Sequence, residues 1–182
     1  MKRNNLTLIL ILLFALTGCS QTQTFTLKSN DVGGQATLKQ VYSGCGGENR
    51  SPQLSWENPP KGTKSFAVTI YDKDAPTGSG WWHWLIFNIP ADIHGLKTDA
   101  GNINTGIAPE GSVQSKTDFG EYGYGGPCPP KRHGIHQYLI TVYALNKEKL
   151  DLDKNASPAV VGFNLNFATI QKASIVMYYE RK

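Results

Sequence analysis

Two separate segments of the sequence each combine a proline-containing turn with a histidine that enters an apolar stretch. In the first, Asp72-Lys73-Asp74-Ala75-Pro76 is followed by Trp81-Trp82-His83-Trp84, and in the second, Gly125-Gly126-Pro127-Cys128-Pro129-Pro130 is followed by His136-Gln137-Tyr138. Histidine rings donate hydrogen bonds and change charge near neutral pH, and a tyrosine hydroxyl adds another donor. If the two segments meet in space, they form a small polar pocket that can hold an anion.

The acidic residues of the first segment cannot act as donors to an anion in such a pocket. An ionised Asp72 cannot contact an anion directly, so we expect it to orient a histidine by accepting its ring N–H, or to receive an ammonium group. The backbone N–H groups between Gly125 and Cys128 are further candidate donors, except at the proline. Trp81 and the two tryptophans near it would limit access of water and so strengthen each polar contact.

Each of these residues also has an ordinary structural interpretation. A single histidine on a strand is more often structural than functional, and this applies to His94 and His133 as well. Asp72 and Asp74 by themselves are typical of a turn before Pro76. Only the joint pattern of the two segments favours a site.

The N-terminal residues 1–18 are typical of a secretory leader. Lys2 and Arg3 precede a mostly apolar run that is short for a membrane span. The run ends at Leu16-Thr17-Gly18-Cys19, which resembles the processing site of bacterial lipoproteins. An ordinary secretory signal with a chance cysteine is the alternative.

The lipoprotein resemblance implies cleavage before Cys19 and lipidation of its thiol. Residues 19–24 would then be a lipidated tether, and residues 25–182 the folded domain. Ser20 favours the outer membrane, so we expect a lipid-anchored protein of the bacterial cell envelope that faces the periplasm.

The composition agrees with one exported domain. Removal of Lys2 and Arg3 with the leader lowers the formal net charge from +4 to +2. The chain shows no clustered stripe of Lys and Arg, so we expect no nucleic-acid partner. In an oxidising compartment Cys45 and Cys128 are compatible with a disulfide, and equally with two separate thiols.

The distribution of apolar residues predicts a fold rich in strands. Residues 65–71, 82–89 and 136–145 have strand length and are dominated by β-branched and aromatic side chains. Residues 98–127 are interpreted as a long loop region with short strands, and 175–179 as a closing strand.

One helix is expected before that closing strand. Ser157 is a candidate N-cap with Pro158 at the first helical position. Four apolar residues then recur at helical spacing and predict a single face buried in the core. The asparagines among them suggest that the helix ends early. The four apolar residues are Val160, Phe163, Phe167 and Ile170.

Taken together, these motifs resemble the phosphatidylethanolamine-binding protein family, whose members are also called Raf kinase inhibitor-like proteins. The stretch Cys45 to Trp56 and the loop 118–126 resemble its bacterial branch. The resemblance covers residues 25 to 180. It implies a mostly β fold of the β-rich α+β type, with a central antiparallel sheet packed on a smaller second sheet and helices near the C-terminus.

The resemblance also implies a pocket for phosphate-like groups and phosphorylated ligands such as phospholipid head groups. One departure is the basic stretch 131–133, which either increases the attraction for an anionic ligand or forms a solvated rim. Carried over by motif, the lining residues are Asp72, His83, His136 and Tyr138, and the rim residues are Asp74, Pro76, Trp81 and Pro130.

Three function classes remain open. Binding of a small phosphorylated anion ranks first, inhibition of a kinase or protease by protein contact second, and an Asp/His hydrolase last. No serine lies in a nucleophile-elbow motif, and no short metal-ligand spacing occurs, so we expect no catalytic residues, no metal and no cofactor. An exported lipoprotein faces away from the cytoplasm, so a protein partner would belong to the envelope.

Overall fold

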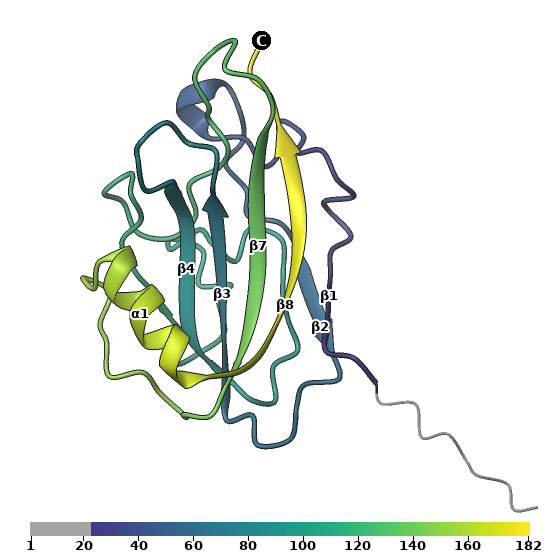
Figure 1. The fold of residues 1–182 in the computed structure, drawn as a ribbon, viewed down its shortest axis with the longest axis vertical. Coiled ribbons are helices and arrows are strands. Elements are labelled where there is room, and N and C mark those ends of the chain that lie inside the picture. Colours follow the sequence, from purple (N-terminus) through teal and green to yellow (C-terminus); the bar gives the residue numbers. More distant parts are fainter. Residues whose placement is uncertain (1–22) are drawn as a thin grey trace, which may run out of the picture.

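The protein is described by a computed structural model over residues 23–182, so the expected leader and Cys19 lie outside the described residues. Two antiparallel sheets form the domain (Figure 1). The large sheet has the order β6-β4-β3-β7-β8 and the small sheet the order β1-β2-β5. The strands of the large sheet are β3 (Ser65–Asp72), β4 (Trp81–Pro90), β6 (Val113–Gln114), β7 (His136–Leu145) and β8 (Thr169–Tyr179). The remaining elements are β1 (Thr26–Lys28), the short 3-10 helix η1 (Ser43–Cys45), β2 (Leu54–Glu57), β5 (Gly95–Leu96) and α1 (Pro158–Ala168).

The large sheet is buried on both faces where its central strands lie. Phe66, Val68 and Ile70 of β3 belong to the core that includes side chains of the small sheet. Ala67 belongs to a second cluster with Leu165 and other residues of α1. Because both faces of β3 are buried, its sequence is a nearly continuous run of apolar residues. The expected fold class, a large antiparallel sheet on a smaller one, is confirmed, with one α-helix near the C-terminus.

The helix begins as expected and ends later than expected. The Val160 backbone N–H donates to the Ser157 hydroxyl at 3.4 Å, and Pro158 is the first helical residue. Asn164 does not end the helix, because its amide donates to the Val160 carbonyl one turn earlier at 2.9 Å. β8 follows without a loop and is longer than the predicted closing strand 175–179. No helix within residues 23–182 is long and apolar enough to cross a membrane.

The predicted buried face of α1 is wrong. The side chains that pack on the sheet are Val161, Leu165 and Ala168. Helical spacing could not identify the buried face, because α1 is apolar around most of its circumference. The four side chains assigned to the core are exposed instead: Val160 by 45%, Phe163 by 64%, Phe167 by 69% and Ile170 by 40%.

Candidate functional site

A pocket of about 230 Å³ lies where β3 ends and β4 and β7 begin. The two proline-and-histidine segments meet here because β3 pairs with both neighbours: Asp72 lies opposite Trp81 on one side and opposite Tyr138 on the other. Antiparallel pairing thus brings residues far apart in sequence to one edge of the sheet. The lining residues are Asp72, Ala75, Pro76, Thr77, Trp81, His83, Phe119, Cys128, Pro129, Pro130, His136 and Tyr138.

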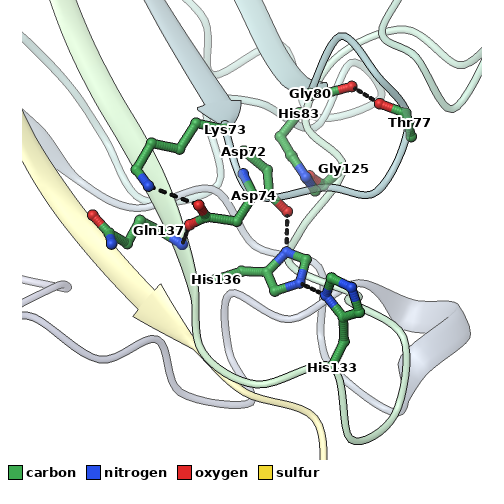
Figure 2. A network of polar contacts seen from close by, with 10 residues as sticks. All are labelled: Asp72, Lys73, Asp74, Thr77, Gly80, His83, Gly125, His133, His136 and Gln137. Carbon is green, nitrogen blue, oxygen red and sulfur yellow. Dashed lines mark hydrogen bonds and ion pairs between the residues drawn. The ribbon is translucent and has the colours of Figure 1, made fainter.

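A chain of hydrogen bonds runs from the pocket to the surface through two histidines (Figure 2). His136 Nδ1 lies 2.7 Å from Asp72 Oδ2, and both side chains are buried. Because a carboxylate only accepts, Nδ1 carries the hydrogen, so Asp72 orients the ring. His136 Nε2 lies 2.8 Å from Nδ1 of the exposed His133. The sequence favoured only a structural role for His133. In the structure, His133 links the buried Asp72–His136 pair to the solvent-exposed surface through this hydrogen bond.

His83 is held by the second segment. Its Nδ1 lies 2.7 Å from the Gly125 carbonyl oxygen, so Nδ1 donates and Nε2 remains as the other polar atom of the ring. Burial lowers the pKa of His83 to about 4, although the Gly125 carbonyl and the charge of Asp72 oppose that shift. The expectation that this ring readily becomes cationic is therefore not met: near pH 7 His83 is neutral and offers Nε2 as an acceptor.

Tyr138 brings an unpaired hydroxyl to the pocket wall. The residue is fully buried, and its Oη has no hydrogen-bond partner among the described residues. Burial raises the pKa of Tyr138 far above its ordinary value, and the negative charge of Asp72 adds to the effect. The hydroxyl therefore stays protonated and remains available as a donor to whatever enters the pocket.

Asp74 does not line the pocket, although the resemblance put it at the rim. Its carboxylate accepts the Gln137 backbone N–H at 2.8 Å and the Lys73 ammonium at 2.7 Å, and its own N–H donates to Asp72 Oδ1 at 2.9 Å (Figure 2). Burial acts to raise the pKa of the Asp74 carboxyl, but the hydrogen bonds from Lys73 and Gln137 and the charge of Lys73 outweigh it and leave the pKa below its ordinary value. Asp74 fixes the end of β3 against the start of β7.

The chain is similar in sequence and in fold to known proteins. Residues 28–180 match the family described as Phosphatidylethanolamine-binding protein. The chain belongs to this family. UPF0098 protein YbcL of Escherichia coli is 48% identical over 171 residues, which cover 92% of this chain and 93% of YbcL. UPF0098 protein YbhB of Escherichia coli is 47% identical over 157 residues, covering 84% of this chain and 98% of YbhB.

A solved structure and a more distant relative extend the likeness. The crystal structure of Escherichia coli YbcL, described as a new member of the mammalian PEBP family, has a TM-score of 0.85 at 50% identity and covers 87% of this chain and 99% of that one. LppC of Mycobacterium tuberculosis is 33% identical over 105 residues, which cover 58% of this chain and 48% of LppC.

In this phosphatidylethanolamine-binding family member, the glycine-proline loop is a rigid wall and offers fewer donors than expected. The Gly125 N–H donates to the His83 carbonyl at 2.8 Å, and the Gly126 N–H donates to Asn49 Oδ1 at 2.7 Å. Cys128 is joined to Cys45 by a disulfide. Cys128 lines the pocket, and its N–H is the one backbone donor of residues 125–128 that forms no hydrogen bond among the described residues.

The glycines of this loop are required by its close packing. A Cβ on Gly126 would collide with the carbonyl oxygen of Gln40, and a Cβ on Gly125 would meet the ring of Phe119. These contacts hold the loop against the 40–42 segment, so the pocket wall cannot move outward without breaking them.

Phe119 is a pocket residue that the sequence did not indicate. Its ring meets those of His83 and Trp81 edge-on, with centroids 5.3 and 5.5 Å apart. The only sequence signal for a role of Phe119 was its position in the loop 118–126, which resembles the bacterial branch of the family. Of the three tryptophans expected near the site, Trp81 alone lines the pocket, while Trp84 lies in the core. Within residues 23–182 no group of three or more His, Cys, Asp or Glu side chains is placed to hold a metal ion.

Proposed function

We propose that the pocket binds small phosphate-type anions, including phosphorylated head groups such as phosphoethanolamine, without catalysing a reaction. The observation that carries this proposal is the buried Tyr138 hydroxyl, which lines the pocket and has no partner among the described residues. Leaving a buried polar group unpaired costs about 1–3 kcal/mol. A ligand oxygen that accepts from this hydroxyl removes the penalty.

The protonation states of the pocket residues restrict the class of ligand further. Neutral His83 offers an acceptor at Nε2, while Tyr138 and the Cys128 N–H offer donors. A phosphate monoester that keeps one proton matches this set, because its P–OH donates to Nε2 while its other oxygens accept. Phosphate monoesters lose this proton near pH ~6. Binding should therefore weaken as the pH rises above that value.

The hydrogen bonds of the lining residues support binding rather than catalysis. The Cys128 thiol is in a disulfide, and the Thr77 hydroxyl donates to the Gly80 carbonyl. Among the described residues, the Asp72–His136 pair is hydrogen-bonded to His133 and to the Asp74 backbone, while the Tyr138 hydroxyl near Asp72 stays protonated because its pKa lies far above its ordinary value. The pair therefore has no nucleophile to activate as it stands.

Calorimetric titration with phosphoethanolamine, inorganic phosphate and sulfate tests the proposal. Sulfate is the matched control ligand, because near neutral pH it has no proton to donate to His83. We expect both phosphates to bind and sulfate to bind much more weakly. Tyr138→Phe removes only the unpaired hydroxyl and should lower phosphate affinity about tenfold, since ~1.4 kcal/mol corresponds to that factor.

Two further variants complete the test. Tyr143→Phe removes a hydroxyl that lies outside the pocket, 3.4 Å from the Thr69 hydroxyl, and should leave affinity unchanged. His136→Ala should weaken binding, because it removes the ring that Asp72 orients. The absence of heat with wild-type protein, or equal phosphate affinity in wild type and Tyr138→Phe, would reject the pocket as the site.

The cellular place of the protein is a second part of the proposal. We infer that residues 1–18 are removed, that Cys19 carries lipid and residues 19–24 form a tether, and that the domain 25–182 faces the periplasm from the outer membrane. The sequence around Cys19 and the relative LppC, which carries the name of a lipoprotein, support this. Mass spectrometry of the N-terminal peptide should find acylated Cys19; a retained leader would contradict it.

A further inference from the structure

The outer face of α1 is apolar although no described part of the chain covers it. Phe163 and Phe167 are exposed by 64% and 69%, and their ring centroids lie 4.8 Å apart. The helix has no charged residue, and its inner face is already used by side chains such as Leu165. Asn164 and Asn166 are the polar side chains of α1, and a helix with so wide an apolar surface is normally covered on most sides. We define the α1 patch as Val160, Phe163, Phe167 and Ile170.

Exposed lysines surround the C-terminal end of the patch. Gly62 lies against Ile170, in the loop that joins β2 and β3. On another side the Asn146 backbone N–H donates to the Ala168 carbonyl at 2.9 Å. Glu148 is the single acid within the lysine-bearing segments 61–64, 146–149 and 170–172, and none of their lysines forms an ion pair among the described residues. The exposed lysines are Lys61, Lys64, Lys147, Lys149 and Lys172.

The N-terminal end of the domain is linked to the same loop. The Asn58 amide donates to the Thr24 carbonyl at 3.2 Å, and the loop that begins at Asn58 reaches Ile170 through Gly62. Figure 1 shows the described N-terminus and the last turn of α1 toward the same end of the molecule, away from the arrowhead of β3. The four steps from Cys19 to Gln23 span at most ~14 Å when fully extended. A lipid on Cys19 therefore holds this end of the domain close to a bilayer.

We propose that the α1 patch docks on the surface of an anionic phospholipid bilayer, with Phe163 and Phe167 in the interface and the lysines toward the head groups. The inference rests on the proposed lipidation of Cys19 for its proximity argument. An apolar helix face flanked by basic residues is typical of interfacial helices. Lysines near an anionic surface are attracted to it, so several lysines and two aromatic rings strengthen the attachment that one lipid anchor provides.

A second copy of the chain fits this patch less well than a bilayer. A stable interface buries about 800 Å² per partner. A whole aromatic side chain supplies ~150–250 Å², and the four side chains of the α1 patch are each only partly exposed. Lysines grouped around the patch would also repel one another across a two-fold axis.

Docking through the α1 patch leaves the pocket open. The patch and the pocket share no residue. Thr169, next to Ile170 of the patch, pairs with Leu145 of β7, and Leu145 pairs with Ser65 at the start of β3. The pocket lies at the other end of β3, at Asp72. The Ile170 end of the patch is thus about seven residue steps along β3, or ~23 Å, from the pocket, while the other end of α1 packs near Trp82, a residue that does not line the pocket. The bound protein therefore keeps its pocket available to a ligand dissolved in the periplasm.

Site-specific photo-crosslinking in the full chain tests this inference. p-Benzoylphenylalanine replaces Phe167 in one variant and Leu38 in another, and each protein is incorporated into vesicles of phosphatidylcholine and phosphatidylglycerol at 7:3, or of phosphatidylcholine alone. Leu38 is the matched control, because it is exposed by 62% and lies outside the α1 patch. We expect at least a tenfold higher yield of lipid adduct at position 167 than at position 38 in the anionic vesicles.

The lysines are tested in the same assay. Lys61→Gln combined with Lys172→Gln should lower the yield at position 167 several-fold in anionic vesicles and leave it nearly unchanged in phosphatidylcholine. Equal lipid yields at positions 167 and 38, an adduct between two protein copies, or no adduct would each overturn the inference. The mass of the N-terminal peptide is read separately, so a protein without lipid on Cys19 that still crosslinks at position 167 rejects only the lipoprotein proposal.

Discussion

At the pocket end of the large sheet, charged and polar side chains are buried, whereas on the outer face of α1 large apolar side chains are exposed. Asp72 and His136 are 3% and 1% exposed, and each has hydrogen-bond partners from another segment. Phe163 and Phe167 touch one another and lie largely in solvent. Both regions depart from the usual distribution of residues, but in opposite directions.

The difference separates what folding requires from what it tolerates. A buried polar pair is stable only when the fold supplies its partners, so the pocket must be held by many long-range contacts. An exposed aromatic ring costs the folded state little, so its presence requires nothing of the domain itself. Substitutions in the first region should therefore change stability, and substitutions on the second should change association with a surface.

The largest effect is expected at the buried pair. Asp72→Ala leaves the His136 Nδ1–H and the Asp74 N–H without their acceptor and should lower the free energy of unfolding by about 3–5 kcal/mol. Glu57→Ala removes the exposed ion pair with Lys28, whose side chains are 59% and 56% exposed, and should cost under ~1 kcal/mol. Urea denaturation of both variants measures the difference; similar losses would show that the pair at the pocket is not stabilising.

His83 gives the pocket end a characteristic dependence on pH. Its pKa is about 4 in the folded protein and ~6.5 in the unfolded chain, so the unfolded chain binds the extra proton between these values. The stability due to neutral His83 is therefore present above pH ~6.5 and is lost as the pH falls toward ~4, by about 3 kcal/mol in all.

His83→Asn separates this contribution from those of other groups. Its amide can still donate to the Gly125 carbonyl but does not titrate. The stability of this variant should fall less steeply than that of wild type between pH 6.5 and 4, as followed by urea denaturation at several pH values. Parallel pH profiles would mean that His83 is not buried in its neutral form.

Within α1, a smaller effect is expected on the inner face. Leu165 is 1% exposed and packs on the sheet. Leu165→Ala should lower the free energy of unfolding by about 2–4 kcal/mol, because it removes apolar contacts and leaves a cavity. Thermal or urea denaturation measures this loss, and a change below ~1 kcal/mol would indicate that the helix is only loosely packed.

The smallest effect is expected two residues further along the helix, on its outer face. Phe167→Ser should change the free energy of unfolding by no more than ~0.5 kcal/mol, the usual range for exposed positions. Leu165→Ala, measured in the same denaturation experiment, is the control on the opposite face of the same helix. A loss of several kcal/mol from Phe167→Ser would mean that the ring stabilises the domain itself, and would remove the contrast with the pocket.

The strands that position the site were predictable because their signal is local. Residues 65–71, 82–89 and 136–145 form strands as expected, and their order places two proline turns next to β3. The role of Asp72 as the group that orients a histidine follows from its chemistry, since a carboxylate beside an imidazole accepts its N–H. The strand-rich character and the polar groups of the two segments could thus be argued from residue types and spacing, whereas the two-sheet fold class was implied by the family resemblance.

Other features depend on partners far away in the sequence. The Gly126 N–H is not free for a ligand, because Asn49 reaches it from another segment. The Asp74 carboxylate accepts the Gln137 backbone N–H and does not line the pocket. Neither contact has a sequence signal, since hydrogen-bond partners are chosen by three-dimensional proximity.

The sequence alone determined which residues carry chemistry and that α1 is apolar. Tertiary structure alone decided that His83 is neutral, that Tyr138 is left without a partner, and that the face of α1 bearing Phe163 is the one in solvent. The physical reason is the same in each case. Side-chain type and periodicity are local properties, whereas burial and the availability of a donor depend on which distant segments pack against the residue.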